Sequence, residues 1–263
     1  MTAEHPPIRT FHPRRGRMSA RHADAHAALW PSVGFTVEDG DREPLDLPEL
    51  FGREAPVVLE IGFGMGDTTA AMAAADPGRD YLGVEVHTPG IGNLLALVAE
   101  QNLLNVRVAR ADAMELVQKI APGALDAIHV FFPDPWPKAR HHKRRLIRPD
   151  NVARLRDRLR PGGLLHCATD WPHYAEAMAE TLDADPGLIR AGAQEREGAA
   201  GKENADAEMG ADREMSANRE ASARVELAAP GWSDRANRPV TKFERRGTAA
   251  GRPITDLRYL RRG

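Results

Sequence analysis

The stretch Val57-Val58-Leu59-Glu60-Ile61-Gly62-Phe63-Gly64-Met65-Gly66 sets the fold class of this chain of 263 residues. It opens with a short apolar run that ends at Ile61 and is typical of a buried strand. A Gly-x-Gly-x-Gly turn follows, and the Ala-rich segment 67–75 predicts a helix that Asp-Pro-Gly at 76–78 ends. Glycines in a strand-to-helix turn allow a tight bend and let a ligand approach the backbone closely.

The alternation of strand and helix continues beyond this turn. Strands are expected at 80–86, 106–109, 124–132 and 163–169, and helices at 89–101, 113–120, 149–159 and 172–182. Thr88 is a candidate N-cap, with Pro89 at the first helical position. Strands separated by helices of about 10 residues predict an α/β fold, a parallel sheet with helices on both faces.

The two flanks differ in composition from the domain expected over residues 55–263. Residues 1–54 are rich in Pro, Arg and His, and we expect a basic N-terminal arm and an irregular layer. Residues 191–222 contain almost no aliphatic or aromatic side chain, so they predict a low-complexity acidic insertion, either disordered or a solvated helix. Order is expected to resume near Arg224, and residues 239–262 are basic and predicted to be strand-like.

The charge balance conceals an uneven distribution. Lys and Arg total 36 and Asp and Glu 38, which alone argues against a nucleic-acid-binding protein. The acidic insertion accounts for this balance, and the remainder is mildly basic. The single Cys167 cannot form an internal disulfide. No run approaches the roughly 18 apolar residues of a membrane helix, and the first 21 residues lack a signal-peptide core, so a soluble, cytoplasmic protein is expected.

Three acids follow or end the first three predicted strands, where ligands of such sheets bind. Glu85 lies about 20 residues beyond the glycine turn, where a carboxylate can bind both hydroxyls of a ribose. Asp112 could accept a hydrogen bond from the exocyclic amine of adenine. Glu60 would repel a pyrophosphate but attract a ligand that carries an ammonium and a sulfonium. Glu60 and the glycine spacing therefore favour S-adenosylmethionine over NAD.

The run Pro-Asp-Pro-Trp-Pro-Lys-Ala-Arg-His-His-Lys-Arg-Arg at 133–145 follows the fourth predicted strand. Flanking prolines restrict the backbone around Asp134, which suits either a helix cap or an acid that must hold a substrate edge. Trp136 could stack on a base or pack in the core. The cations suit a phosphate backbone, and the two histidines suit phosphate or sugar. The candidates are Lys138, Arg140, His141, His142, Lys143, Arg144 and Arg145.

Two further segments are candidates for the site, and neither supplies a metal. Asp170, at the end of the fifth predicted strand, either caps the next helix or faces the substrate. The segment Thr241-Lys242-Phe243-Glu244 has the alternating polarity of an ordinary strand. No Cys-x-x-Cys or His-Glu-x-x-His pattern is present, so no metal site is expected.

Together these residues resemble the bacterial tRNA (guanine-N7-)-methyltransferases. The resemblance rests on residues 60–66, 83–87, 133–145, 168–171 and 238–247, and it spans about residues 9–190 and 230–263. It implies a Rossmann-like class I S-adenosylmethionine-dependent fold with a mostly parallel seven-stranded sheet. The substrate it implies is guanosine 46 in the variable loop of tRNA. The insertion before Thr241 looks longer than is usual in the family.

The resemblance also implies roles for individual residues. Cofactor-binding positions match Glu60, Gly62, Glu85, Asp112 and Asp134, of which Asp134 is the catalytic residue. Substrate-binding positions match Lys138, Asp170, Thr241, Lys242, Phe243 and Glu244, and RNA-contacting positions match residues 140–145.

Two other functions remain open at this point: a methyltransferase with a protein or small-molecule acceptor, and a non-catalytic RNA-binding module. The oligomeric state, monomer or homodimer, does not follow from the sequence.

Overall fold

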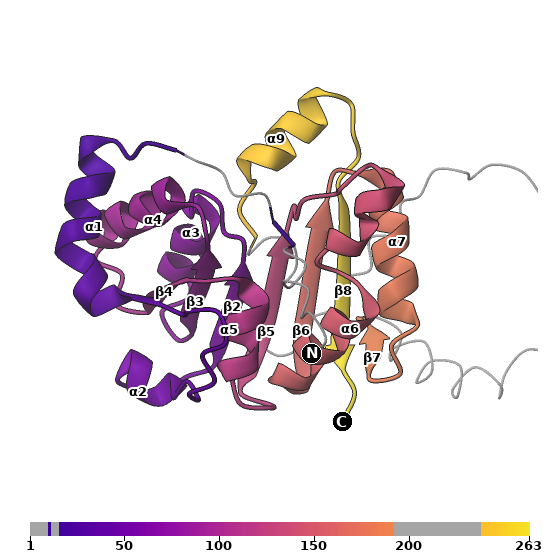
Figure 1. The fold of residues 1–263 in the computed structure, drawn as a ribbon, viewed down its shortest axis with the longest axis horizontal. Coiled ribbons are helices and arrows are strands. Elements are labelled where there is room, and N and C mark those ends of the chain that lie inside the picture. Colours follow the sequence, from indigo (N-terminus) through magenta and orange to yellow (C-terminus); the bar gives the residue numbers. More distant parts are fainter. Residues whose placement is uncertain (1–9, 12–15, 192–237) are drawn as a thin grey trace, which may run out of the picture.

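The computed structural model describes residues 10–11, 16–191 and 238–263, which form one eight-stranded sheet with helices on both faces (Figure 1). The strand order is β1-β4-β3-β2-β5-β6-β8-β7. Every pairing from β1 to β6 is parallel, whereas β8 runs antiparallel to both β6 and β7. The strands are β1 (Gly34–Thr36), β2 (Val57–Ile61), β3 (Asp80–Glu85), β4 (Val106–Arg110), β5 (Leu125–Phe131), β6 (Leu159–Thr169), β7 (Leu188–Arg190) and β8 (Thr255–Arg261).

Side chains that alternate along the buried strands divide the core into two layers. In β2, Val58 belongs to the layer under α3 (Asp67–Ala75) and α4 (Thr88–Gln101), against which α1 (Ala20–Val33) also packs. The next residue, Leu59, belongs to the layer on the other face. The helices of that face are α2 (Leu47–Phe51), α5 (Ala113–Lys119), α6 (Pro149–Arg158) and α7 (Pro172–Asp183). The expected α/β fold with a mostly parallel sheet is confirmed.

The sheet has eight strands rather than the seven expected. The region expected to be an irregular layer, within residues 1–54, contains a helix and a strand. Residues 20–36 form α1 and the edge strand β1, which pairs with β4. The helix packs Leu29 and Trp30 against the apolar layer over α4, and Arg21 pairs with Glu100 of α4 at 2.7 Å. These apolar anchors are sparse in the sequence, which is why the helix was not predicted. His87 rather than Thr88 is the N-cap of α4.

The C-terminal region is also not simply strand-like, because α9 (Lys242–Ala249) precedes β8. Thr241 is the N-cap of α9, and its Oγ1 accepts a hydrogen bond from the Glu244 N–H at 3.0 Å. The sequence Thr-x-x-Glu is a capping signature that predicts the start of a helix. The alternating polarity of the same residues, which is typical of a strand, obscured this signature. Figure 1 shows α9 above the sheet, at the end opposite to the C-terminus.

Several expectations concern residues that the structure does not describe. These are the acidic insertion beyond Ala191, the return of order near Arg224, and the N-terminal part of the basic arm.

Candidate active site

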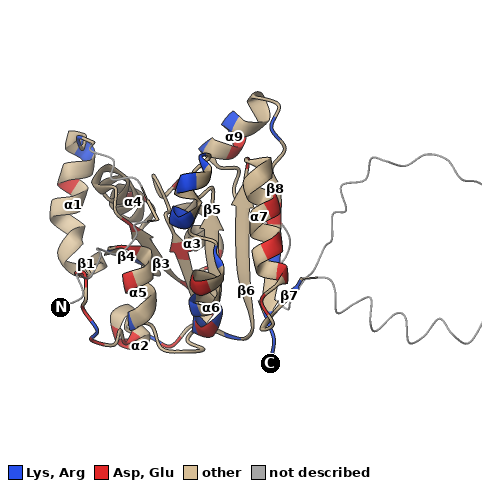
Figure 2. Ribbon diagram, turned by 45° about the vertical axis from the view of Figure 1, so that its right-hand side comes forward, with Lys and Arg blue, Asp and Glu red and all other residues tan. Residues whose placement is uncertain are grey.

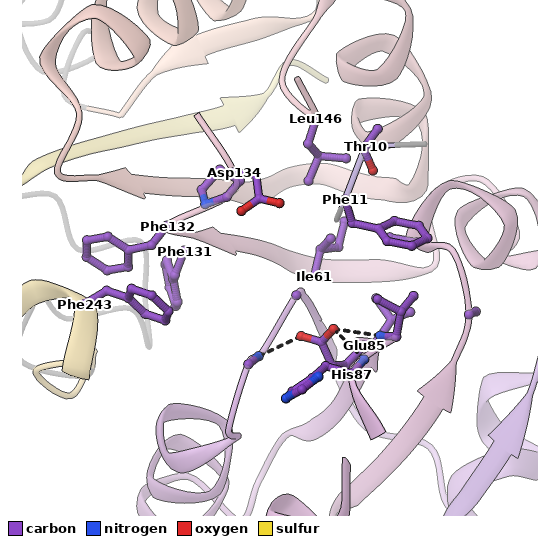
Figure 3. Close-up of a pocket in the computed structure, with 17 residues that line it drawn as sticks. Thr10, Phe11, Ile61, Glu85, His87, Phe131, Phe132, Asp134, Leu146 and Phe243 are labelled. Atoms are coloured by element: carbon purple, nitrogen blue, oxygen red, sulfur yellow. Dashed lines mark hydrogen bonds between the residues drawn. The ribbon is translucent and has the colours of Figure 1, made fainter. Parts of the chain in front are cut away.

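A cleft opens at the end of the sheet where β2, β3 and β5 finish, and it encloses about 900 Å³ including its open mouth. Figure 3 shows Asp134 between Phe243 on one side and Phe11 on the other. Apolar side chains line much of the cleft, as is usual for a small-molecule site. The lining residues are Thr10, Phe11, Ile61, Gly62, Gly64, Val84, Glu85, Val86, His87, Ala111, Ala113, Phe131, Phe132, Pro133, Asp134, Leu146 and Phe243.

The glycine turn after β2 forms the floor of this cleft. Its three glycines all have positive φ, between 62° and 78°, a conformation that other residues adopt only with strain. The turn also needs a fourth glycine, Gly90 of α4. A Cβ built there would lie 1.9 Å from the carbonyl oxygen of Gly64, so only glycine lets α4 pack against the turn. Sequence reasoning missed Gly90 because the contact joins segments far apart in the chain.

The carboxylate of Glu85, at the end of β3, fixes the shape of the turn. Its Oε2 accepts a hydrogen bond from the Gly64 N–H at 3.0 Å, and its Oε1 accepts from Val86 and His87 at 2.7 and 3.0 Å. Glu85 lines the cleft, and these contacts are drawn in Figure 3.

Glu60 lies behind the cleft wall rather than in it. Its side chain is buried, and its Oε2 accepts a hydrogen bond of 2.6 Å from the Thr69 hydroxyl of α3. Burial raises the pKa of Glu60 to about 7, against the effect of the Thr69 hydroxyl and with the help of the nearby Glu85 charge. Glu60 is therefore poised to change its charge near neutral pH.

Asp112 also lies outside the set of lining residues. It is the N-cap of α5, and its Oδ1 accepts a hydrogen bond from Met114 N–H at 2.9 Å. Its two neighbours, Ala111 and Ala113, do line the cleft. The cap thus holds this part of the wall in place.

Asp134 lines the cleft, and the backbone around it is strained. Phe132 and Trp136 are two of the three described residues other than glycine that have positive φ, at 54° and 46°. Strain of this kind costs on the order of 1–3 kcal/mol per residue and persists where the surrounding contacts impose it. The segment around Asp134 is therefore held in one geometry.

Trp136 packs in the interior of its loop, which decides between the two roles predicted for it. The side chain is buried, and its Nε1 donates a hydrogen bond to the Thr10 carbonyl at 3.2 Å. The guanidinium of Arg144 stacks on the indole, and the His141 ring meets it edge-on. The indole thus joins the loop to the N-terminal segment that lines the cleft.

The cations of the loop divide into outer and inner groups. Most are carried by the short 3-10 helix η1 (Ala139–Arg144). Lys138, Arg140, His142 and Lys143 are exposed. Arg145, in contrast, is buried: its Nε donates to the Pro135 carbonyl at 3.0 Å, and its guanidinium covers the Tyr174 ring. Arg145 therefore supports the loop from within, and the RNA contact expected for it stays a prediction.

Asp170 neither caps a helix nor lines the cleft. The N-cap of α7 is Trp171, and Asp170 Oδ2 accepts hydrogen bonds from Nε and Nη2 of Arg252 at 3.0 and 2.8 Å. Arg252 follows α9, so this pair ties the end of β6 to the C-terminal segment.

The segment 241–244 is split between the cleft and the interior. Phe243 is 43% exposed, lines the cleft and stacks on Phe132 with ring centres 6.0 Å apart. Lys242 is exposed. Glu244 is buried, and its Oε2 accepts a hydrogen bond from Arg238 Nη1 at 2.8 Å. Glu244 thus supports α9 from within, and the substrate contact expected for it stays a prediction.

Among the described residues, no group of three or more His, Cys, Asp and Glu side chains could hold a metal ion. No helix within residues 16–191 and 238–263 is both long and apolar enough to cross a membrane.

Comparison with known proteins finds relatives that match nearly the whole chain. Residues 54–211 match the sequence model of a family described as "Putative methyltransferase". A protein of Paraburkholderia xenovorans (strain LB400) named "tRNA (guanine-N(7)-)-methyltransferase" is 48% identical over 97% of this chain and 84% of its own length. A protein of the same name from Streptomyces coelicolor is 45% identical over 97% of this chain and 81% of its own. Among solved structures, the 16S rRNA methyltransferase KamB has a TM-score of 0.49 at 16% identity, covering 87% of this chain and 99% of its own.

Proposed function

This chain belongs to the tRNA (guanine-N(7)-)-methyltransferases, and from that membership we propose how its cleft performs the reaction. The enzyme transfers a methyl group from S-adenosylmethionine to N7 of a guanine in tRNA. The observation that carries the proposed division of labour is the position of Asp134. It lines the cleft at the end of β5, between the glycine turn and a loop that carries exposed cations.

The cleft suits S-adenosylmethionine in the chemistry of its lining. Glu85 is anchored by three backbone N–H groups, which leaves part of its carboxylate able to accept from ribose hydroxyls. Ile61, Ala111 and Phe11 offer apolar surface for an adenine ring. Glu60, behind the glycine turn, supplies negative charge for the ammonium end of the cofactor. When bound, the cofactor supplies an electrophilic methyl group on a sulfonium.

Asp134 acts on the guanine. N7 carries an in-plane lone pair and no proton, so methyl transfer needs no base to create the nucleophile. Positive charge develops on the purine as the sulfonium is neutralised, and the Asp134 carboxylate stabilises that charge. The same carboxylate can accept from N1–H and the 2-amino group of guanine and hold the ring edge-on for in-line attack. Asp134 is thus both an orienting and an electrostatic residue.

The exposed cations of the loop bind the RNA that carries the guanine. Lys138, Arg140 and Lys143 face outward next to the cleft, where they can neutralise phosphates without touching the base. The target nucleotide is guanosine 46 of the variable loop, and the site of action is the cytoplasm. We infer the nucleotide and the compartment from the family membership.

Mapping of the methylated base tests the proposal. Purified protein is incubated with S-adenosylmethionine and an unmodified tRNA transcript, and the product nucleosides are located by mass spectrometry of nuclease fragments. A 7-methylguanosine at position 46 is expected, and a transcript with adenosine at that position should stay unmethylated. Methyl incorporation into protein or small acceptors but not into tRNA would contradict the proposal. Failure of the protein to bind the cofactor in a calorimetric titration would instead indicate a non-catalytic RNA-binding module.

A further inference from the structure

One cation of the loop 133–145 is turned away from the solvent. Arg145 is 8% exposed, whereas His142 and Lys143 of the same loop are exposed. Figure 2 shows Lys and Arg residues gathered on the segment that leads into α6. Burial removes a guanidinium from water at a cost in free energy, which a phosphate contact at the surface does not require. The inward position of Arg145 therefore indicates a role other than surface charge.

Arg145 holds the backbone beside Asp134. Its Nε donates a hydrogen bond to the Pro135 carbonyl at 3.0 Å. Three of the five residues 133–137 are prolines, which carry no N–H, so at those positions the backbone can only accept hydrogen bonds. The Pro135 carbonyl belongs to the peptide unit that leads into Trp136, whose φ is strained at 46°. The hydrogen bond from Arg145 therefore helps to hold the strained backbone that carries Asp134.

A tyrosine of α7 fixes Arg145 in turn. The guanidinium carbon lies 4.7 Å from the centre of the Tyr174 ring, a cation–π contact that is stronger where water is excluded. Tyr174 is fully buried, and its hydroxyl accepts a hydrogen bond from the Ile147 N–H at 3.2 Å. Leu146, between Arg145 and Ile147, lines the cleft as Asp134 does (Figure 3). Tyr174 therefore supports both Arg145 and the cleft wall that follows it.

We propose that Arg145, seated on Tyr174, is a positioning residue for methyl transfer, which fixes the backbone that carries Asp134 and does not contact a phosphate of the tRNA. This inference rests on the proposed function, in which Asp134 orients the guanine and stabilises its developing charge. A displacement of about 1 Å in a group that acts on the substrate can lower a rate by about 10²-fold. Loss of the hydrogen bond to Pro135 should therefore slow the chemical step and leave tRNA binding unchanged.

Two substitutions of Arg145 separate position from charge. Arg145→Gln removes the charge but places an amide N–H as many bonds from the backbone as Nε, so it can still donate to the Pro135 carbonyl. Arg145→Lys keeps the charge but has a methylene group at that place, which cannot donate. Single-turnover methylation of an unmodified tRNA transcript, with both substrates saturating, should be about tenfold or more slower in Arg145→Lys than in the wild type. Arg145→Gln should retain more of the rate than Arg145→Lys, whereas a phosphate contact would give the opposite order.

The salt dependence of tRNA binding gives a second measurement. Loss of one phosphate contact lowers the slope of log K against log salt by about 0.7–0.9. The slope of Arg145→Gln should equal that of the wild type, whereas Lys143→Gln, an exposed cation of the same loop, should lower it. Arg190→Lys is the matched control for the rate, because Arg190 also lies over a tyrosine ring, that of Tyr259 at 5.7 Å, but in the edge strand β7. Its rate should equal that of the wild type.

Hydrogen–deuterium exchange of the free protein tests the support of the loop without a substrate. The amide groups of residues 132–138 should exchange faster in Arg145→Lys than in Arg145→Gln. Equal exchange in the two variants, a faster rate in Arg145→Lys than in Arg145→Gln, or a lower salt slope in Arg145→Gln would overturn the inference. If the wild type methylates tRNA in the same experiments, the proposed function stands even where the role of Arg145 fails.

Discussion

The guanidinium of Arg144 lies 4.1 Å from the centre of the Trp136 indole ring. This contact joins the basic half of the loop 133–145 to its acidic half, because Trp136 is two residues from Asp134. The indole in turn donates to the Thr10 carbonyl, next to Phe11 in the cleft wall. One buried side chain thus links the cations proposed to bind RNA, the acid proposed to be catalytic and the N-terminal wall of the cleft.

Replacement of Trp136 should therefore change the stability of the fold more than it changes the rate of methyl transfer. Trp136→Ala removes a buried aromatic ring and should lower the free energy of unfolding by about 3 kcal/mol. Trp136→Phe keeps a ring under Arg144 but loses the hydrogen bond to Thr10, and it should cost about 1 kcal/mol. Denaturant unfolding measures both. Equal stability of the two variants would contradict the packing role.

Asp134→Asn should reduce methyl transfer by about 10²- to 10³-fold, because the isosteric amide cannot stabilise positive charge on the purine. Cofactor affinity should fall much less, since Glu60 and Glu85 are unchanged. Single-turnover methylation of tRNA separates the two effects. Asp150→Asn, an exposed acid of α6, is the control and should retain wild-type turnover. Wild-type turnover in Asp134→Asn would exclude the catalytic assignment.

Binding of the cationic cofactor should depend on pH through Glu60. The raised pKa, about 7, means that the free protein holds this carboxyl largely protonated below pH 7 and largely ionised above it. A cationic ligand favours the ionised form, so binding should release a proton and tighten as pH rises, by up to about tenfold per pH unit below the pKa. Calorimetry in buffers of different ionisation enthalpy counts the proton. Glu60→Gln should abolish its release, and release that persists in this variant would assign the proton to another group.

Gly90→Ala should be destabilising, although alanine normally favours a helix interior over glycine by up to about 1 kcal/mol. The new Cβ would meet the Gly64 carbonyl and displace the glycine turn. We expect a loss of at least about 2 kcal/mol, seen as a fall in Tm of roughly 4–8 °C, together with weaker cofactor binding. Gly78→Ala is the control, since its Cβ would have only an ordinary contact of 3.4 Å with Asp76. Equal Tm values for both variants would show that the turn tolerates the displacement.

Much of the fold was readable from local patterns. The five inner parallel strands and their helices were predicted within a few residues, apart from an earlier start to β6, because the strands are rich in apolar residues and most are bounded by glycine, proline or capping signals. The edge strands β1 and β7 have only three residues each, so their pairing depends on neighbours that no local pattern reveals. In α9 the capping signature Thr241-x-x-Glu244 was present, but alternating polarity outweighed it.

The candidate site divides in the same way. Gly62, Glu85 and Asp134, which stand next to glycine or proline signals at the ends of strands, line the cleft. For residues whose role depends on a distant partner, the sequence did not show that role. Arg238 and Glu244 form a buried pair, Asp170 is bound by Arg252, and Arg145 supports its own loop from within. In each case the sequence shows that the side chain is charged. It does not show whether that side chain contacts water or another side chain.

The sequence by itself determined the class of sheet, the family and the acid at the end of β5, because strand periodicity, glycine turns and proline-bounded loops are local properties of the chain. Only the tertiary structure decided which charges are free to meet the substrate. Burial of an arginine or a carboxylate is tolerated only when an opposite charge or hydrogen-bonding partner meets it, and for Arg238, Glu244 and Asp256 those partners come together only when α9 and β8 pack onto the sheet.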